Sequence, residues 1–124
     1  MSADAETEPI TIFHNPKCSK SRGAVELVDA QGTTYTVVEY LKAPPDRATL
    51  DHITARYQGP AVDLVRTSDD AFADLDIDPA TLTTPDSVVE VLLSHPEVMQ
   101  RPIVVRGDSV IIARPSELVA QVLD

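Results

Sequence analysis

The sequence predicts an α/β fold with a mixed sheet, in which a β–α–β unit at the start of the chain and a β–β–α unit at its end flank a helical insertion. Three observations carry this prediction. Segments 10–14 and 35–40 are rich in β-formers and lie on either side of a stretch with helical spacing of its apolar residues. Segments 103–105 and 110–112 are apolar and flank a Gly-Asp pair, as in an antiparallel hairpin. The stretch between these two units contains several helical segments bounded by proline or glycine.

The first unit begins with Ile10–His14, where apolar and polar residues alternate as in a strand. An Asn-Pro pair ends this strand, because the residue before proline avoids the helical region and proline lacks a backbone donor. A helical pattern starts at Cys18 and is expected to stop at Gly32, and segment 35–40 is predicted as a second strand. The order strand–helix–strand predicts a parallel strand pair with a crossover helix.

The middle of the chain is predicted to be helical. One helix is expected between the Pro44-Pro45-Asp46 cluster and Gly59-Pro60, and another from Thr84 to His95, with short helical pieces between Ala61 and about Asp78. Pro115-Ser116-Glu117 predicts the start of a last helix, because proline is tolerated in a first turn and glutamate suits a helix start. This order of elements predicts a thioredoxin-like α/β domain with extra helices in its middle.

Length and composition predict one domain, from residue 10 to 124, preceded by a disordered acidic tail at residues 1–9. The net charge of −10 argues against nucleic acid or an anionic membrane as a partner. No apolar run approaches the roughly 18 residues of a membrane helix, and the first residues contain no apolar signal core. We therefore expect a cytoplasmic protein, and we expect it to be a monomer.

The chain contains one cysteine, Cys18, so it cannot close an internal disulfide. The cysteine stands at the predicted start of a helix, where free amide groups and the helix dipole stabilise a negative charge, and Lys17, Lys20 and Arg22 flank it. This position predicts a thiol with a lowered pKa and nucleophilic character. The alternative is a buried, inert cysteine, which the polar and cationic neighbours disfavour.

Spacing excludes several other cysteine chemistries. Cys18 and Ser21 form a C-x-x-S arrangement, so there is no dithiol, and the C-x5-R pattern of a phosphatase loop fails because position 24 is Ala24. One cysteine and three scattered histidines do not form a zinc-ligand pattern, and no metal is expected.

Four further residues are candidates for the site. His14 lies four positions before Cys18 and is expected to lower the thiol pKa as a cation or to shuttle a proton, unless it merely ends a strand. Arg66, Arg101 and Arg114 suit oxyanion binding, because guanidinium groups match oxyanions with paired hydrogen bonds. Each arginine also fits a surface position paired with one of the twenty acidic residues.

Six segments together are specific for one superfamily: Ile10-Thr-Ile-Phe-His-Asn-Pro-Lys-Cys-Ser-Lys-Ser-Arg22, Tyr40-Leu-Lys-Ala-Pro-Pro45, Val65-Arg66, His95-Pro96, Arg101-Pro-Ile-Val-Val105 and Arg114-Pro-Ser-Glu117. Through them, nearly everything from Ile10 onward resembles the glutaredoxin-coupled arsenate reductases of bacteria. The resemblance implies that Cys18 is the catalytic cysteine, that His14 tunes it, and that the three arginines bind the oxyanion and converge on the thiol. It also implies a cis peptide bond before Pro102, and supporting roles for Asn15, Ser21, Arg22 and Pro102.

The implied reaction is the reduction of arsenate to arsenite by a thiolate, with an external thiol such as glutathione as co-substrate and a glutaredoxin-like carrier protein. No tightly bound cofactor is expected, since no nucleotide or flavin motif is present. Segment 67–72 is more acidic than expected beside an anion site, which predicts weaker substrate affinity but unchanged chemistry.

Two sister groups share this fold. The regulators of the Spx type bind RNA polymerase and usually carry a C-x-x-C pair, which is absent here. A second group resembles arsenate reductases and keeps the cysteine but often loses part of the arginine set, which is complete in this sequence. The alternatives to an arsenate reductase are an interaction domain of the Spx type and a general thiol transferase acting on glutathione adducts.

Overall fold

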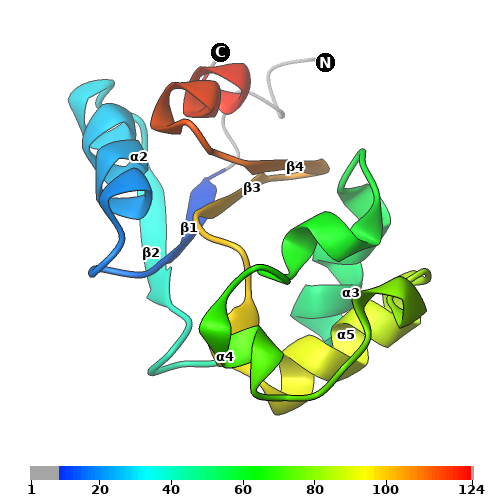
Figure 1. Cartoon of the computed structure of the whole chain (residues 1–124). Coiled ribbons are helices and arrows are strands. Elements are labelled where there is room, and N and C mark those ends of the chain that lie inside the picture. Colours follow the sequence, from blue (N-terminus) through cyan, green and yellow to red (C-terminus); the bar gives the residue numbers. More distant parts are fainter. Residues whose placement is uncertain (1–8, 124) are drawn as a thin grey trace. The chain divides into compact units, whose positions relative to one another are not determined.

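Four strands form one mixed sheet in the order β2-β1-β3-β4 (Figure 1). The first strand, β1 (Ile10–His14), pairs in parallel with β2 (Tyr35–Glu39) and antiparallel with β3 (Ile103–Arg106). Strand β3 also pairs antiparallel with β4 (Ser109–Ile112), and Gly107 adopts a positive φ of 59° in the turn between them. The parallel pair, the hairpin and the thioredoxin-like arrangement are as predicted.

The structure, a computed structural model, describes residues 9–123. Apart from Pro9, the predicted acidic tail therefore lies outside the described residues. The described residues divide into two compact units, one built from residues 9–40 and 101–123 and the other from residues 41–100. The prediction of one domain from 10 to 124 stays a prediction. Across the described part of the chain, no helix has the length and apolar character needed to cross a membrane.

In the first unit, α2 (Ser19–Ala30) and the 3₁₀ helix η4 (Ser116–Val122) pack against each other and against the sheet (Figure 1). The last helix is thus confirmed, but as a 3₁₀ helix, with i→i+3 bonds such as Leu118 N–H to the Pro115 carbonyl at 3.0 Å. The core between the sheet and these helices consists of small aliphatic side chains: Ile10, Ile12, Ala24, Val28, Val104, Ala113, Val119 and Val122.

Gly23 in α2 lies beside Ser116, the first residue of η4. A Cβ atom at this position would come within 2.6 Å of Ser116 Oγ and 3.1 Å of Ser116 Cβ, so a larger residue would displace the Ser116 side chain. Ser116 Oγ in turn donates a hydrogen bond to the Lys20 carbonyl at 2.7 Å. These contacts hold the beginning of η4 beside the first turn of α2.

The second unit is helical, as predicted for the middle of the chain. Helix α3 (Arg47–Arg56) packs against α5 (Pro85–Ser94). Both starts are capped: Asp46 accepts the Thr49 N–H, and Thr84 forms a reciprocal capping box with Ser87. Four short elements complete the unit: η1 (Ala61–Leu64), α4 (Asp70–Ala73), η2 (Pro79–Thr81) and η3 (Pro96–Val98).

The register of the sheet brings three chain segments to one edge. Strand β1 ends at His14, and its neighbour Phe13 pairs with Ile103, the first residue of β3. Ile103 pairs with Ile112, the last residue of β4. The segments just after β1, just before β3 and just after β4 therefore meet at the same edge. These segments carry Cys18, Arg101 and Arg114.

Candidate active site

Cys18 is the N-cap residue of α2, the position predicted from the sequence. Its N–H donates to the Asn15 carbonyl at 3.0 Å, and its carbonyl accepts the Arg22 N–H at 3.0 Å, which is the first hydrogen bond of the helix. The side chain is partly exposed and the thiol is free. The sulfur is therefore held at the positive end of a twelve-residue helix and stays accessible to a reactant.

The environment of Cys18 favours the thiolate. Burial of the sulfur opposes ionisation, but the backbone amides of Ser21 and Lys20 and the Arg114 guanidinium outweigh it, so the pKa of Cys18 lies below its ordinary value. The predicted direction of the pKa shift is thus the one that the structure supports. The stabilising groups are helix amides and an arginine distant in sequence, rather than the adjacent side chains of Lys17 and Arg22.

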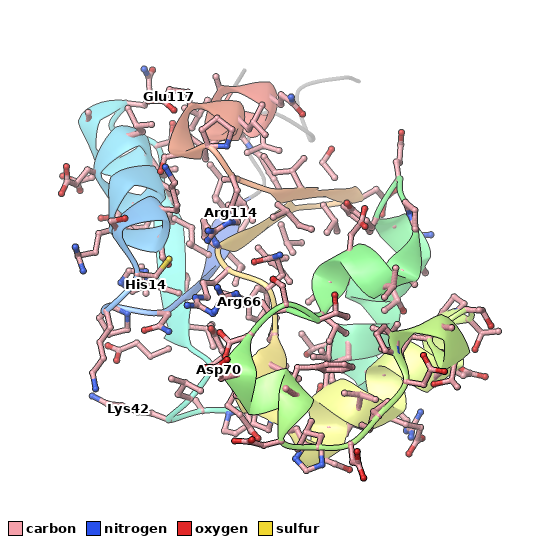
Figure 2. The ribbon with its side chains drawn as sticks, viewed as in Figure 1. His14, Lys42, Arg66, Asp70, Arg114 and Glu117 are labelled. Atoms are coloured by element: carbon pink, nitrogen blue, oxygen red, sulfur yellow. The ribbon has the colours of Figure 1, made fainter. Side chains whose placement is uncertain are left out.

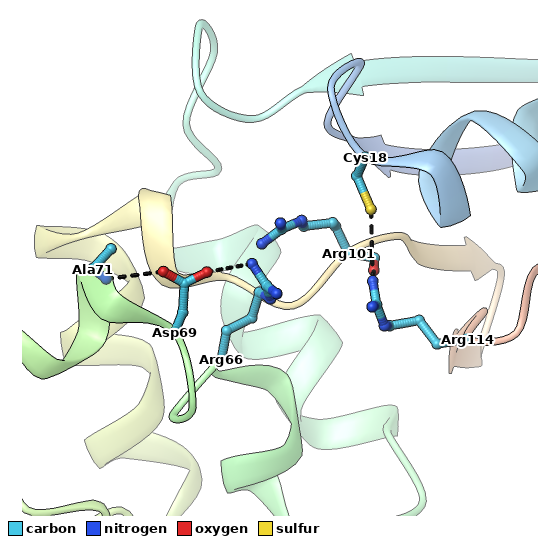
Figure 3. Close-up of polar contacts among 6 residues, drawn as sticks. All are labelled: Cys18, Arg66, Asp69, Ala71, Arg101 and Arg114. Atoms are coloured by element: carbon cyan, nitrogen blue, oxygen red, sulfur yellow. Dashed lines mark hydrogen bonds and ion pairs between the residues drawn. The ribbon is translucent and has the colours of Figure 1, made fainter.

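Arg114 contacts the reactive sulfur directly (Figure 3). Its Nη1 lies 3.6 Å from Cys18 Sγ and also donates to the carbonyl of Arg101 at 2.9 Å. Arg101 itself is half-buried and lies just before β3. One guanidinium thus joins the thiol to the segment that precedes β3, although Arg114 and Cys18 are 96 positions apart in sequence.

The loop before Cys18 is held by its own side chains. Asn15 Oδ1 accepts the Lys17 N–H at 3.0 Å, and the Asn15 N–H donates to Ser21 Oγ at 3.0 Å. Arg22 Nη1 donates to the Pro16 carbonyl at 2.8 Å. The contacts of Asn15, Ser21 and Arg22 therefore shape the loop that presents the sulfur, which suits the supporting role predicted for them.

His14 is buried at the end of β1, and its Nδ1 forms a hydrogen bond of 2.6 Å with Ser21 Oγ. Burial lowers the pKa of His14, Glu39 on the neighbouring strand opposes this effect, and Arg22 adds to it. The net lowering argues against the cationic role predicted for His14 at neutral pH. Ser21 also supplies an amide to the sulfur, so His14 and the sulfur contact the same residue. Figure 2 shows His14 and Arg114 near the start of α2.

Two peptide bonds at this edge of the sheet are cis. The bond between Arg101 and Pro102 is cis, as predicted. The bond between Arg114 and Pro115 is cis as well, which was not predicted because an Arg-Pro pair alone does not specify its isomer. Pro102 is buried and leads into β3.

Arg66 belongs to the second unit. Its Nη1 forms an ion pair with Asp69 Oδ2 at 2.5 Å (Figure 3). The acidic segment after Arg66 thus contains a direct partner of this arginine. From the sequence alone, the same segment was expected only to weaken the binding of an anion. The available signal was an aspartate three residues after an arginine and directly before a helix start. The predicted convergence of Arg66 on Cys18 stays a prediction.

Among residues 9–123, no three His, Cys, Asp or Glu side chains gather in a way that could hold a metal ion. The groups that the site brings together are a thiol with a lowered pKa, backbone amides and a guanidinium donor.

The lowered thiol pKa can be measured directly, because Cys18 is the only cysteine in the chain. We expect the rate of iodoacetamide alkylation to rise with pH through a midpoint below that of a free thiol, since only the thiolate reacts. The same chain unfolded in urea is the internal reference, because unfolding removes the helix amides and Arg114 from the sulfur. Equal midpoints for the folded and unfolded chains would contradict the assigned environment.

A thioredoxin-like fold with one activated thiol at a helix N-terminus defines this protein as a thiol-dependent oxidoreductase. The family model of the ArsC family matches residues 13–122. The chain therefore belongs to the ArsC family.

The comparisons also give individual relatives. An arsenate reductase of Neisseria meningitidis serogroup A is 36% identical over 115 residues, which are 92% of this chain and 97% of the relative. A protein of Escherichia coli K12 named only YfgD is 34% identical over 118 residues, covering 94% of this chain and 98% of the relative. A solved structure of an arsenate reductase from Vibrio cholerae matches with a TM-score of 0.83 and 28% identity, covering 94% of this chain and 99% of that one.

Proposed function

We propose that this protein is an arsenate reductase that uses Cys18 as its nucleophile. The observation that carries the proposal is the contact between the Cys18 sulfur at the start of α2 and the Arg114 guanidinium, which offers a thiolate and an oxyanion donor at one place. Membership of the ArsC family and relatives named arsenate reductases support the choice of substrate.

In the first step, the Cys18 thiolate attacks the arsenic of arsenate, an As–S bond forms, and one oxygen leaves as water after taking up protons. Arg114 and the amides of Lys20 and Ser21 offset the negative charge of the adduct, as an oxyanion hole does. Arg101 and Arg66 are proposed as the remaining oxyanion-binding arginines. His14, Asn15, Ser21, Arg22 and Pro102 are proposed to hold the loop and the β3 start in place.

The electrons come from outside the chain. Reduction of arsenic from the pentavalent to the trivalent state needs two electrons, which two thiols supply by becoming one disulfide. A chain with one cysteine supplies at most one of these thiols, so the thiols that become the disulfide come from outside. An external thiol replaces a second oxygen of the adduct, which leaves as water. A second thiol then attacks the sulfur of the external thiol: an S–S bond forms, the As–S bond to the external thiol breaks with its electron pair on arsenic, and water releases arsenite from Cys18. Over one cycle, arsenate and two thiols give arsenite, one disulfide and water.

We propose a small thiol such as glutathione as the co-substrate, a glutaredoxin-like protein as the carrier, and no tightly bound cofactor. A cysteine that works as a free thiol suits a reducing compartment, and we therefore propose the cytoplasm. We also propose that the protein acts as a monomer, because the cycle does not need a second Cys18.

Arsenite release is expected to depend entirely on added thiol. Purified protein is incubated with arsenate alone, with a small thiol, and with thiol plus carrier, and arsenite is quantified over time. We expect less than one arsenite per protein without thiol and repeated turnover with thiol and carrier, because one cysteine cannot supply both electrons.

Thiol and carrier without the protein form the background control. Repeated turnover without added thiol would show that the proposed cycle is wrong. The same assay distinguishes a general thiol transferase, which would reduce a glutathione mixed disulfide but release no arsenite above the background.

A further inference from the structure

We propose that Asp69 is a positioning residue for Arg66, which fixes the arginine for its oxyanion. This inference rests on the proposed function, in which Arg66 binds arsenate. It reverses the expectation from the sequence that the acidic segment after Arg66 merely weakens anion binding.

Asp69 and Arg66 form a closed turn with two hydrogen bonds, and a third hydrogen bond joins Asp69 to Ala71. The Asp69 N–H donates to the Arg66 carbonyl at 3.1 Å, Arg66 Nη1 donates to Asp69 Oδ2 at 2.5 Å, and Asp69 Oδ1 accepts the Ala71 N–H at 2.9 Å (Figure 3). Asp69 is the N-cap residue of α4, so its carboxylate is held by the helix on one side and presents its second oxygen to Arg66. The two side chains are only 20% and 28% exposed, which reduces screening of the pair.

The backbone of Arg66 is anchored independently. Its N–H donates to the Val98 carbonyl at 2.7 Å, and the preceding Val65 forms a β-bridge with Met99. With the backbone held by this bridge and the tip held by Asp69, the long side chain loses much of its rotational freedom. An oxyanion that binds Arg66 then does not have to order the side chain first, which favours binding.

The charge of Asp69 has the opposite effect on an anion. Hydrogen bonds from the Ala71 N–H and the Arg66 guanidinium keep the pKa of Asp69 below its ordinary value, so the carboxylate is ionised at neutral pH. A carboxylate beside a guanidinium repels an incoming oxyanion. If charge alone mattered, removal of Asp69 would tighten substrate binding; if positioning dominates, removal weakens it. The sign of the change therefore decides between the two.

The experiment uses two variants that remove the carboxylate but keep a helix cap, Asp69→Asn and Asp69→Ser, because asparagine and serine are both preferred N-cap residues. The matched control is Asp70→Asn, which removes the same charge from the exposed neighbouring residue and leaves the Arg66–Asp69 pair intact. Thermal unfolding of all three variants verifies that the fold is retained.

Two readouts are taken for each variant. The first is the KM for arsenate and the kcat of arsenite release with thiol and carrier. The second is the concentration of inorganic arsenate that protects Cys18 from iodoacetamide by half, which does not require turnover. For Asp69→Asn and Asp69→Ser we expect both KM and the half-protecting concentration to rise about three- to tenfold, with a smaller change in kcat, since a charge-assisted hydrogen bond that orders a binding group is lost. Asp70→Asn should leave both values unchanged or lower them slightly.

A fall in KM for the Asp69 variants, or a change equal to that of Asp70→Asn, would overturn the inference. Failure of the proposed function has a different signature, because the unmodified protein would then release no arsenite and arsenate would not protect Cys18. A loss of thermal stability with unchanged KM would show that Asp69 acts only as a helix cap and would also overturn the inference.

Discussion

Replacement of Cys18 by serine is expected to abolish arsenate reduction, with kcat/KM falling about a thousandfold or more, to the background of the assay. A serine hydroxyl is a far weaker nucleophile than a thiolate, and it cannot form the mixed sulfur species through which electrons reach arsenic. The fold should not suffer, because Cys18 is the N-cap of α2 and serine is among the preferred N-cap residues.

Arsenite release and thermal unfolding are measured on the same preparations of Cys18→Ser. The matched control combines Cys18→Ser with Ser19→Cys, which restores a thiol one residue further along, at the first position of the helix. We expect this double variant to stay inactive, because the amides of Lys20 and Ser21 and the Arg114 guanidinium are arranged around position 18. Substantial activity in Cys18→Ser would show that Cys18 is not the nucleophile, and activity only in the double variant would show that the thiol need not be at position 18.

Replacement of Arg114 by alanine is expected to lower kcat/KM by about a hundredfold, the usual loss when one oxyanion-hole donor is removed. Two effects combine in this variant. The pKa of Cys18 rises, because Arg114 is one of the groups that lower it, so less thiolate is present at neutral pH. The charge that develops on the arsenate adduct also loses a donor that lies beside the sulfur.

The pH dependence separates the two effects. Raising the pH restores the thiolate of Arg114→Ala but not the missing donor, so its deficit in kcat/KM should shrink with rising pH and still persist. The alkylation midpoint of Cys18 should move to higher pH in the same variant. Arg114→Lys is the matched control, which keeps the charge but lacks the planar guanidinium whose Nη1 contacts both the sulfur and the Arg101 carbonyl. Its kcat/KM should fall between the values of the unmodified protein and of Arg114→Ala.

Thermal unfolding again verifies the fold, since Arg114 also contacts the backbone before β3. An Arg114→Ala variant with unchanged kcat/KM and an unchanged alkylation midpoint would remove the observation on which the proposed function rests. A folded but inactive Arg114→Ala with an unchanged midpoint would leave Arg114 as an oxyanion donor only.

Local sequence signals were sufficient to predict the elements of this protein and the position of its cysteine. The β-rich segments 10–14 and 103–105 and the proline and glycine boundaries predicted the strands and helices, because these signals act within a few residues. The place of Cys18 at a helix start followed from the same local pattern, and with it the direction of its pKa shift. The predicted oxyanion-binding arginines came from a resemblance between sequences.

The tertiary structure decided which groups contact the thiol. Arg114 lies 96 positions from Cys18 and reaches its sulfur only because the antiparallel register of β1, β3 and β4 brings the segments beyond their ends to one edge of the sheet. Burial decided the state of His14, since a sequence does not show that the imidazole loses water and bonds to Ser21 instead of carrying a charge. The pairing of Arg66 with Asp69 likewise depends on the direction of the side chains at the start of α4. Composition alone indicated only that the acidic segment would repel an anion. In each case the deciding quantity is a distance or a degree of burial set by packing, which no local pattern of residues encodes.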